Sequence, residues 1–297
     1  MGKAAAREHR QERVEAVRAQ QAREARRKVV LSVTAVAVVV AVIAALVVVK
    51  VVTSGHQTGP SASAPNLASA SVVSALSTVP AATFNTVGAG TLTARPVPIT
   101  AAALTADGKA RVLYDGAEYC PYCAGERWAV AVALSRFGTW SGLGATSSSS
   151  TDTYPNTATL AFHGATYAST YLSFTGYEET TNQPQGTSYV PLDTLPAADQ
   201  AIVRMFDAVP YIPAASAGSI PFIDIGGRYV ISGASYDVSV LQGKTREQIA
   251  AALKDPNSDV AKAIIGTANV ITADICKVLG STAPAVCSSP GVVSAGP

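Results

Sequence analysis

The sequence predicts an α/β domain of layered architecture that follows a membrane-anchoring segment. Three observations support this prediction. A chain of 297 residues, of which 48% are hydrophobic, is long enough to bury a sizeable core. Short apolar runs typical of buried strands alternate with stretches of helical spacing, a pattern that favours strands and helices packed in layers. One uncharged apolar run, Val29–Val49, stands apart near the N-terminus.

Charge is distributed unevenly along the chain, although the formal net charge is only +2. The first 28 residues contain nine Lys or Arg and four Glu, whereas the residues from Val51 onward contain 12 basic and 16 acidic side chains. Nucleic-acid-binding domains concentrate positive charge on their working surface. We therefore expect no nucleic-acid partner, and we expect residues 1–28 to form a basic, polar helical segment.

The run Val29–Val49 contains no charged residue, no Pro and no Gly, and Lys28 and Lys50 flank it. As a helix it would reach roughly 31 Å, about the thickness of the hydrocarbon core of a bilayer. Residues 29–52 are thus predicted to form a transmembrane helix. A cleaved signal peptide is the alternative, with small residues at Ser61–Ala64, but the basic region and the apolar run are both long for such a signal.

The basic flank precedes the apolar run, so the positive-inside rule places the N-terminus in the cytoplasm and the main domain outside it. We therefore expect a single-pass protein of the cell membrane. Residues 53–99 are rich in Ser, Ala, Thr and Pro and almost uncharged, which predicts a linker in which Leu67–Leu76 could form a short helix. The extracytoplasmic domain is expected to comprise residues 100–290.

Within this domain the expected order is strand, helix, strands, helix, hairpin and helices. Gly226-Gly227 supplies the positive φ angles that a two-residue hairpin requires, so the residues on either side are predicted to be paired strands. Loops are predicted at Ser141–Ser150 and Glu178–Gly186. Strands are predicted at Arg111–Tyr114, Thr157–Phe162, Ser169–Phe174, Ile220–Ile225 and Arg228–Ile231, and helices at Ala124–Phe137, Pro196–Val209, Thr245–Leu253 and Ser258–Ile265.

The motif Cys120-Pro121-Tyr122-Cys123 joins a predicted strand to a predicted helix. The first Cys would lie at the helix N-terminus, where unpaired N–H groups and the helix dipole favour a thiolate. The second would lie one turn inside the helix, and Pro suits the first helical position. Cys120 is therefore the candidate nucleophile and Cys123 the candidate resolving thiol. A purely structural disulfide and half of a metal site are the alternatives.

The second pair, Cys276 and Cys287, brackets a Gly-, Ser- and Pro-containing segment near the C-terminus. Thiols outside the cytoplasm can form lasting disulfides, and four Cys permit three pairings. We expect Cys276 and Cys287 to form a structural disulfide, which would close a loop and contribute roughly 3 kcal/mol. A shuttle that passes electrons to Cys120 is the alternative.

The segment from Val112 to Cys123 resembles the strand-to-active-site region of the thioredoxin superfamily, and its Pro-Tyr dipeptide resembles that of glutaredoxins. Ile220-Pro221 before the Gly-Gly hairpin resembles the cis-proline loop of that superfamily. This resemblance implies a thioredoxin-like fold in which Pro221 is cis and the Ile220 backbone and Tyr122 contact substrate. With Glu126–Trp128 and the C-terminal Cys pair, residues 100–287 are similar to a prokaryotic membrane family called domain of unknown function 929.

The sequence departs from thioredoxins in three places. Thioredoxins bury an acid six residues before the first Cys, where this chain has Tyr114, followed by Asp115. Tyr122 stands where periplasmic disulfide oxidases have His. About a hundred residues separate Cys123 from Pro221, so the stretch Thr139–Leu192 is expected to be an insertion between the active-site helix and the cis-proline hairpin, with a role in contacting substrate.

These observations lead to one functional expectation and two alternatives. We expect a membrane-anchored, extracytoplasmic thiol–disulfide oxidoreductase that acts on protein thiols or disulfides with a membrane or soluble redox partner, and that needs no cofactor and no metal. The motif is equally compatible with oxidase, isomerase and reductase activity. The first alternative is a redox-inert binding or scaffold domain of the same fold. The second is a metal-handling protein, which would need a third ligand near the Cys pair.

Overall fold

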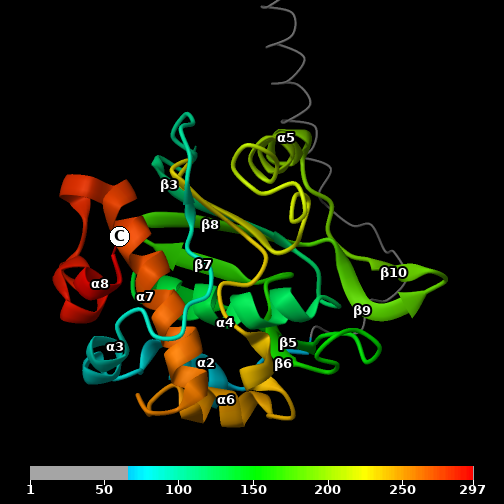
Figure 1. The fold of residues 1–297 in the computed structure, drawn as a ribbon, viewed down its shortest axis with the longest axis horizontal. Helices are drawn as coiled ribbons and strands as arrows, with labels where there is room; N and C mark the ends of the chain where they lie inside the picture. Colours follow the sequence, from blue (N-terminus) through cyan, green and yellow to red (C-terminus); the bar gives the residue numbers. More distant parts are fainter. Residues whose placement is uncertain (1–65, 297) are drawn as a thin grey trace, which may run out of the picture. The chain divides into compact units, whose positions relative to one another are not determined.

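The apolar run around Leu113 forms a strand in the middle of a mixed sheet (Figure 1). The computed structural model describes residues 66–296; the predicted basic segment, transmembrane helix and first part of the linker lie outside these residues. The strand order in the six-stranded sheet is β1-β12-β11-β3-β2, and β8 also pairs with β3. The bounds of these strands are β1 Val97–Pro98, β2 Thr105–Ala106, β3 Lys109–Gly116, β8 Leu172–Glu178, β11 Phe222–Ile225 and β12 Tyr229–Ser232.

The strand β3 pairs with β8 in parallel and with β11 in antiparallel orientation. The parallel register sets Gly116, at the end of β3, opposite Glu178, at the end of β8. The hairpin of β11 and β12 is confirmed: Gly226 and Gly227 both have positive φ, of 64° and 70°. The β3–β8 pairing brings the two strand ends together directly below the start of the next helix.

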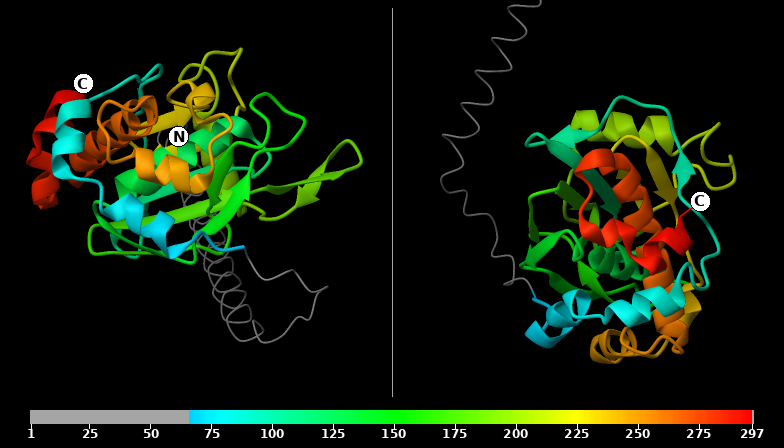
Figure 2. Two further views of the ribbon diagram at one scale, coloured as in Figure 1. Left: turned by 90° about the horizontal axis from the view of Figure 1, so that it is seen from below. Right: turned by 90° about the vertical axis from the view of Figure 1, so that its left-hand side faces the viewer.

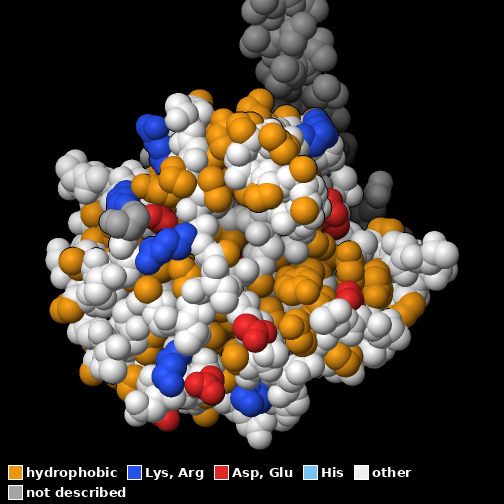
Figure 3. Space-filling view, viewed as in Figure 1, with side chains coloured by type: hydrophobic (Ala, Val, Ile, Leu, Met, Phe, Trp, Pro, Cys, Tyr) orange, Lys and Arg blue, Asp and Glu red, His pale blue; other side chains and the backbone are white. Residues whose placement is uncertain are grey.

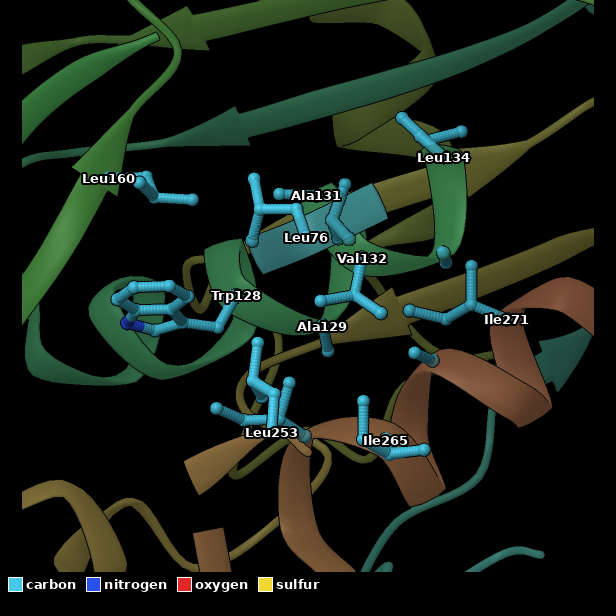
Figure 4. Close-up of a cluster of buried hydrophobic side chains, with 14 of the residues drawn as sticks. Leu76, Trp128, Ala129, Ala131, Val132, Leu134, Leu160, Leu253, Ile265 and Ile271 are labelled. Atoms are coloured by element: carbon cyan, nitrogen blue, oxygen red, sulfur yellow. The ribbon is translucent and has the colours of Figure 1, made fainter. Parts of the chain in front are cut away.

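One face of the sheet is covered by α4 (Pro121–Leu134) and α7 (Asp259–Leu279), which pack against each other. Figure 4 shows α4 side chains between α7 and the strand that carries Leu160, with Trp128 and Val132 turned into the cluster. Thirteen of the 14 residues of α4 are buried. Because a helix buried on all sides has no solvated face, its polar residues must find partners inside the protein.

The opposite face of the sheet carries a second, smaller core beside α5 (Ala197–Phe206). All four residues of β11 are buried, and since side chains alternate along a strand, Ile223 belongs to the α4–α7 core while Phe222 packs with Phe206 and Ile212. The sheet is thus the middle layer of three. Since Cys120 and Cys123 lie on α4, the α4 side of the sheet holds the dithiol.

Within residues 66–296, three two-stranded sheets stand beside the central one. The hairpin of β9 and β10 extends away from the rest of the domain (Figures 1 and 2). The three small sheets pair β4 (Gly138–Ser141) with β7 (Thr166–Ser169), β5 (Gly144–Ser147) with β6 (Ala158–Ala161), and β9 (Thr180–Gln185) with β10 (Ser188–Pro191).

The predicted insertion Thr139–Leu192 is wrong as a single unit, because it contains β8, a strand of the central sheet. The additional elements lie before and after β8. The loops predicted at Ser141–Ser150 and Glu178–Gly186 are also wrong in part, since β5 and β9 form there. Their Ser, Thr and Gln residues hide the strands because hairpins with little burial need no apolar pattern.

The predicted linker 53–99 is corrected over its described part. From Asn66 onward the chain forms α2 (Ala70–Ser77) and α3 (Ala81–Val87), and both helices pack on the core. Val72 and Leu76 are each 1% exposed, and Leu76 lies beside Ala131 in Figure 4. These two side chains stand among Ala and Ser, so the apolar pattern of this segment is weak in the sequence. Their burial depends on the helices against which α2 packs. The folded part therefore begins well before residue 100.

At the C-terminal end, α6 (Arg246–Ala252) begins with a capping box between Thr245 and Gln248, and α7 is much longer than the predicted Ser258–Ile265. The segment Asp259–Thr282 is long and apolar enough to cross a membrane, yet 72% of its most apolar stretch is buried inside the domain, as expected of a core helix. The expected disulfide between Cys276 and Cys287 is confirmed.

The disulfide joins the end of α7 to a short 3-10 helix, Ala285–Ser288, which leads into α8 (Pro290–Ala295). Figure 2 shows α8 beside α3. Gly291 approaches the backbone of Phe84 so closely that a Cβ would lie 2.3 Å from its carbonyl oxygen. The disulfide therefore anchors a C-terminal segment that packs against α3.

The fully buried carboxyl of Glu126 lies in the interior of α4. It accepts hydrogen bonds from the backbone N–H of Ser235 (2.9 Å) and from the Ser235 hydroxyl (3.0 Å). Burial raises the pKa of Glu126 from 4.5 to about 7. The folded protein therefore binds this proton more tightly than the unfolded chain does, and this group's contribution to stability falls as the pH rises between these two values.

We predict that Glu126→Gln makes the protein less sensitive to alkaline pH. The variant should gain up to about 3 kcal/mol in unfolding free energy relative to wild type between pH 4 and pH 8, because Gln carries no charge to bury. Urea unfolding at a series of pH values measures this. Glu247→Gln, at an exposed position of α6, is the control for loss of one carboxylate. An unchanged pH profile in Glu126→Gln would contradict the prediction.

Candidate functional site

The sulfur of Cys120 lies at the N-cap of α4. Its backbone is extended (φ −72°, ψ 123°), and its Sγ accepts a hydrogen bond from the backbone N–H of Cys123 at 3.2 Å. Pro121 occupies the first turn, where a missing N–H costs nothing. The predicted placement of Cys120 at a helix start is thus confirmed, and the sulfur itself acts as the cap.

The two thiols are not joined by a disulfide and differ in environment. Hydrogen bonding from the Cys123 side chain, helped by backbone N–H groups and the charge of Arg127, lowers the pKa of Cys120 below its ordinary value. Complete burial raises the pKa of Cys123 well above its ordinary value. Cys120 is therefore the thiol that ionises first, as its role as nucleophile requires.

The loop before β11 closes over Cys120. The Cys120 thiol donates to the carbonyl oxygen of Ile220, at 3.6 Å, across a separation of 100 residues. The Ile220–Pro221 peptide bond is cis, as predicted from the resemblance; the Val209–Pro210 bond is cis as well. The fold thus brings Ile220 and Pro221 next to the dithiol, although about 100 residues separate them from it along the chain.

A fully buried ion pair lies beneath the dithiol. The guanidinium of Arg127 donates to both carboxylate oxygens of Glu178, at 2.7 and 2.5 Å, and neither side chain is exposed. The Nη2 atom of Arg127, which donates to Glu178 Oε2, also donates to the carbonyl oxygen of Ala117 (2.6 Å) in the loop that leads to Cys120. Arg127 follows Cys123 by four residues, so both project from the same face of α4. The pair therefore joins the end of β8, the β3–α4 loop and the helix.

The neighbours Tyr114 and Asp115 face opposite sides of the sheet. Tyr114 is fully buried in the α4–α7 core, and burial raises its pKa well above the ordinary value. Asp115 lies on the opposite face of β3, and its burial, together with the negative charges of Glu179, Glu178, Asp207 and Asp199, raises its pKa to about 7. Asp115 is therefore not the acid beneath the dithiol; Glu178, from the adjacent strand, provides the buried carboxylate on that side.

Aromatic rings from the added hairpins and loops surround the dithiol loop. Tyr189 of β10 stacks on Tyr119 with ring centroids 4.2 Å apart, and Tyr154 meets Tyr122 edge to face at 6.3 Å. Tyr122 is 44% exposed. Figure 3 shows hydrophobic side chains gathered on this face between α5 and the β9–β10 hairpin. The accessory elements thus contribute to the surface around Cys120.

A pocket of about 400 Å³ opens beside this surface. Ile220, which contacts the Cys120 sulfur, is part of its wall, as is Tyr122. The remaining lining comes from the segments around Thr93, Tyr154, Ser216–Ser219 and Ser232–Val238. The two residues predicted to contact substrate, Ile220 and Tyr122, therefore meet at one pocket next to the nucleophile.

Sequence reasoning did not identify Arg127, Glu178, Tyr154 and Asp237 as parts of this region. The sequence did contain a signal for Arg127. Glu126 and Arg127 are charged residues inside an otherwise apolar helix, a pattern typical of buried charges that have partners. Within residues 66–296 there is no group of three or more His, Cys, Asp or Glu side chains that could hold a metal ion.

Comparison with known proteins identifies the family of the chain. The family described as Domain of unknown function (DUF929) matches residues 95–277, and the protein belongs to it. The matched range includes the dithiol, the Ile220–Pro221 loop and Cys276, whereas Cys287, α2 and α3 lie outside it. No curated protein and no solved structure matches the chain.

We predict that Arg127→Met destabilises the protein by about 3–5 kcal/mol, because it leaves the Glu178 charge buried without a partner. Arg127→Met/Glu178→Met should recover most of this loss. In both variants the pH midpoint for alkylation of Cys120 should rise, since the nearby positive charge is gone. Chemical unfolding and pH-dependent alkylation measure the two effects.

Arg111→Met is the matched control. Arg111 forms a two-pronged ion pair with Asp199 (2.8 and 2.6 Å) on the α5 side of the sheet, away from the dithiol. Loss of the Arg111–Asp199 ion pair should reduce the stability of the protein without changing the pH midpoint for alkylation of Cys120. Equal shifts of that midpoint in the Arg111 and Arg127 variants would show that the effect comes from general loosening of the fold.

Proposed function

We propose that this member of the DUF929 family is a thioredoxin-like thiol–disulfide oxidoreductase, anchored in the membrane and acting outside the cytoplasm on protein substrates. The observation that supports it most is the contrast between Cys120, a helix-capping thiol of lowered pKa, and Cys123, a fully buried thiol of raised pKa. This contrast is what a nucleophile and a resolving thiol require.

The topology supports the thioredoxin-like assignment. The elements β3, α4, β8, α5 and the β11–β12 hairpin, followed by helices, give the order strand, helix, strand, helix, hairpin, helix that the resemblance implies. The dithiol starts the first of these helices, and the cis Ile220–Pro221 bond precedes the hairpin. The uncharged run Val29–Val49 with its basic flank supports the anchor and the extracytoplasmic setting.

In the proposed reaction the Cys120 thiolate attacks one sulfur of a substrate disulfide and displaces the other as a thiolate, which takes up a proton. Cys123 then loses its proton and attacks Cys120 in the mixed disulfide, releasing the second substrate thiol and leaving a Cys120–Cys123 disulfide. The substrate gains two electrons and the dithiol loses two. The reverse sequence oxidises a substrate dithiol, and a partner disulfide or dithiol restores the starting state.

A redox-inert binding domain is the second candidate, and one observation favours it: Cys120 is only 5% exposed. A substrate sulfur must therefore reach an atom that the surrounding residues almost completely cover. In the binding function the same surface would hold a partner, and the two thiols would react with neither disulfides nor alkylating reagents at neutral pH.

We predict that Cys123→Ala traps a mixed disulfide between Cys120 and a substrate protein, since attack still occurs but resolution cannot. Cys120→Ala should trap nothing and lose activity entirely. The measurements are reduction of insulin by the full-length protein and non-reducing electrophoresis of the trapped species. With both cysteines present, Pro221→Ala should weaken turnover or prolong the mixed disulfide, because the adjoining Ile220 carbonyl contacts the nucleophile.

Alkylation of single-Cys variants separates the two candidate functions. For an enzyme, the Cys120 midpoint should lie clearly below the ordinary value of about 8.5 for a free thiol. An ordinary midpoint together with no turnover of insulin or of a scrambled disulfide protein would overturn the enzyme and leave the binding domain.

A further inference from the structure

The pocket beside Ile220 contains one charged side chain among its described lining residues, the carboxylate of Asp237. Asp237 is exposed and caps the short 3-10 helix Val238–Leu241 by accepting a hydrogen bond from the backbone N–H of Ser239 at 2.9 Å. No ion pair among residues 66–296 includes it. The cap leaves the carboxylate exposed, so its negative charge is available to a ligand.

The rest of the pocket adds aromatic and hydroxyl groups to this charge. Tyr122 and Tyr154 line it with rings that meet edge to face at 6.3 Å, and Thr93, Ser219 and Ser232 add hydroxyl groups. Aromatic faces attract ammonium and guanidinium groups, and a neighbouring carboxylate strengthens that attraction. The same charge disfavours ligands that carry carboxylates. The lining is therefore suited to a cationic side chain.

The position of the pocket connects this preference to the dithiol. The Ile220 residue that lines the pocket also places its carbonyl oxygen 3.6 Å from the Cys120 sulfur. Consecutive Cα atoms of a polypeptide lie about 3.8 Å apart, so a substrate whose cysteine reaches Cys120 places the side chains one or two residues away at this wall. A Lys or Arg side chain is long enough to extend from there toward Asp237.

We propose that this pocket binds a Lys or Arg side chain located one or two residues from the reacting cysteine of a polypeptide substrate, and so makes basic polypeptides the preferred substrates. This inference rests on the proposed oxidoreductase function. Asp237 is a specificity residue in it: it touches the substrate but takes no part in sulfur exchange. Small anionic thiols and acidic peptides are accordingly poor substrates.

Three disulfide-linked peptides test the proposal with the full-length protein in detergent. They are identical except for Lys, Ala or Glu two residues from the cysteine. The expected order of kcat/KM is Lys, then Ala, then Glu, with roughly a 5- to 20-fold range between Lys and Glu at low ionic strength. The range should shrink with added salt, because the Asp237 carboxylate is exposed to solvent.

Asp237→Asn should reduce the ratio of kcat/KM between the Lys and Glu peptides to about twofold or less. The variant should keep the helix cap, since Asn has nearly the same shape as Asp and caps helices as well. Asp107→Asn is the matched control: Asp107 is an exposed acid in the turn between β2 and β3, at the other end of β3, and its φ of 52° suits Asn. This variant should retain the wild-type ratio.

The outcomes separate the inference from the function on which it rests. Equal kcat/KM for the three peptides, or an unchanged ratio in Asp237→Asn, overturns the basic-side-chain pocket while leaving the oxidoreductase intact. A ratio lost equally in Asp107→Asn overturns it too, since the effect then comes from net charge. Turnover of none of the peptides overturns the proposed function, and this inference with it.

Discussion

The buried ion pair between Arg127 and Glu178 is the interaction on which the arrangement of the site depends. It connects α4 to the end of β8, and through the Ala117 carbonyl it also fixes the loop that carries Cys120. A fully buried pair is costly to desolvate, and apolar residues of similar volume can replace such pairs without loss of stability. The charge of Arg127 in this pair also acts on the two thiols, and it lowers the pKa of both.

The sheet separates the acidic groups near the dithiol into two environments. Alternation along β3 directs Tyr114 toward α4 and Asp115 toward α5, although the two are adjacent in the sequence. Parallel pairing then aligns Glu178 with Gly116, so that a carboxylate from the neighbouring strand reaches the space beneath the helix. The buried acid on the dithiol side thus comes from β8 and is held by Arg127.

Much of the domain could be predicted from the sequence, because its central elements have strong local signals. The apolar run at Leu113, the Gly-Gly hairpin and the Cys-Pro-Tyr-Cys helix start each follow from local chemistry, and the structure contains all three. The elements that could not be predicted depend on tertiary contacts. Val72 and Leu76 are buried only because α4 and α6 receive them, and β9 pairs with β10 through polar residues that read as a loop. Tyr154 and Asp237 reach the dithiol region by folding of segments far from it in the chain, which no local pattern reveals.

The two charges around the dithiol have different consequences because they differ in burial. Arg127 is inaccessible, so its field acts at low dielectric on the sulfurs and is little screened by salt. Asp237 is exposed, and water weakens its effect on Cys120 while leaving it able to attract or repel an arriving side chain. In the proposed enzyme a buried cation can therefore favour the thiolate while a surface carboxylate selects the substrate, and neither cancels the other. The accessory loop that supplies Tyr154 contributes to the second task, because Tyr154 lines the pocket beside Asp237.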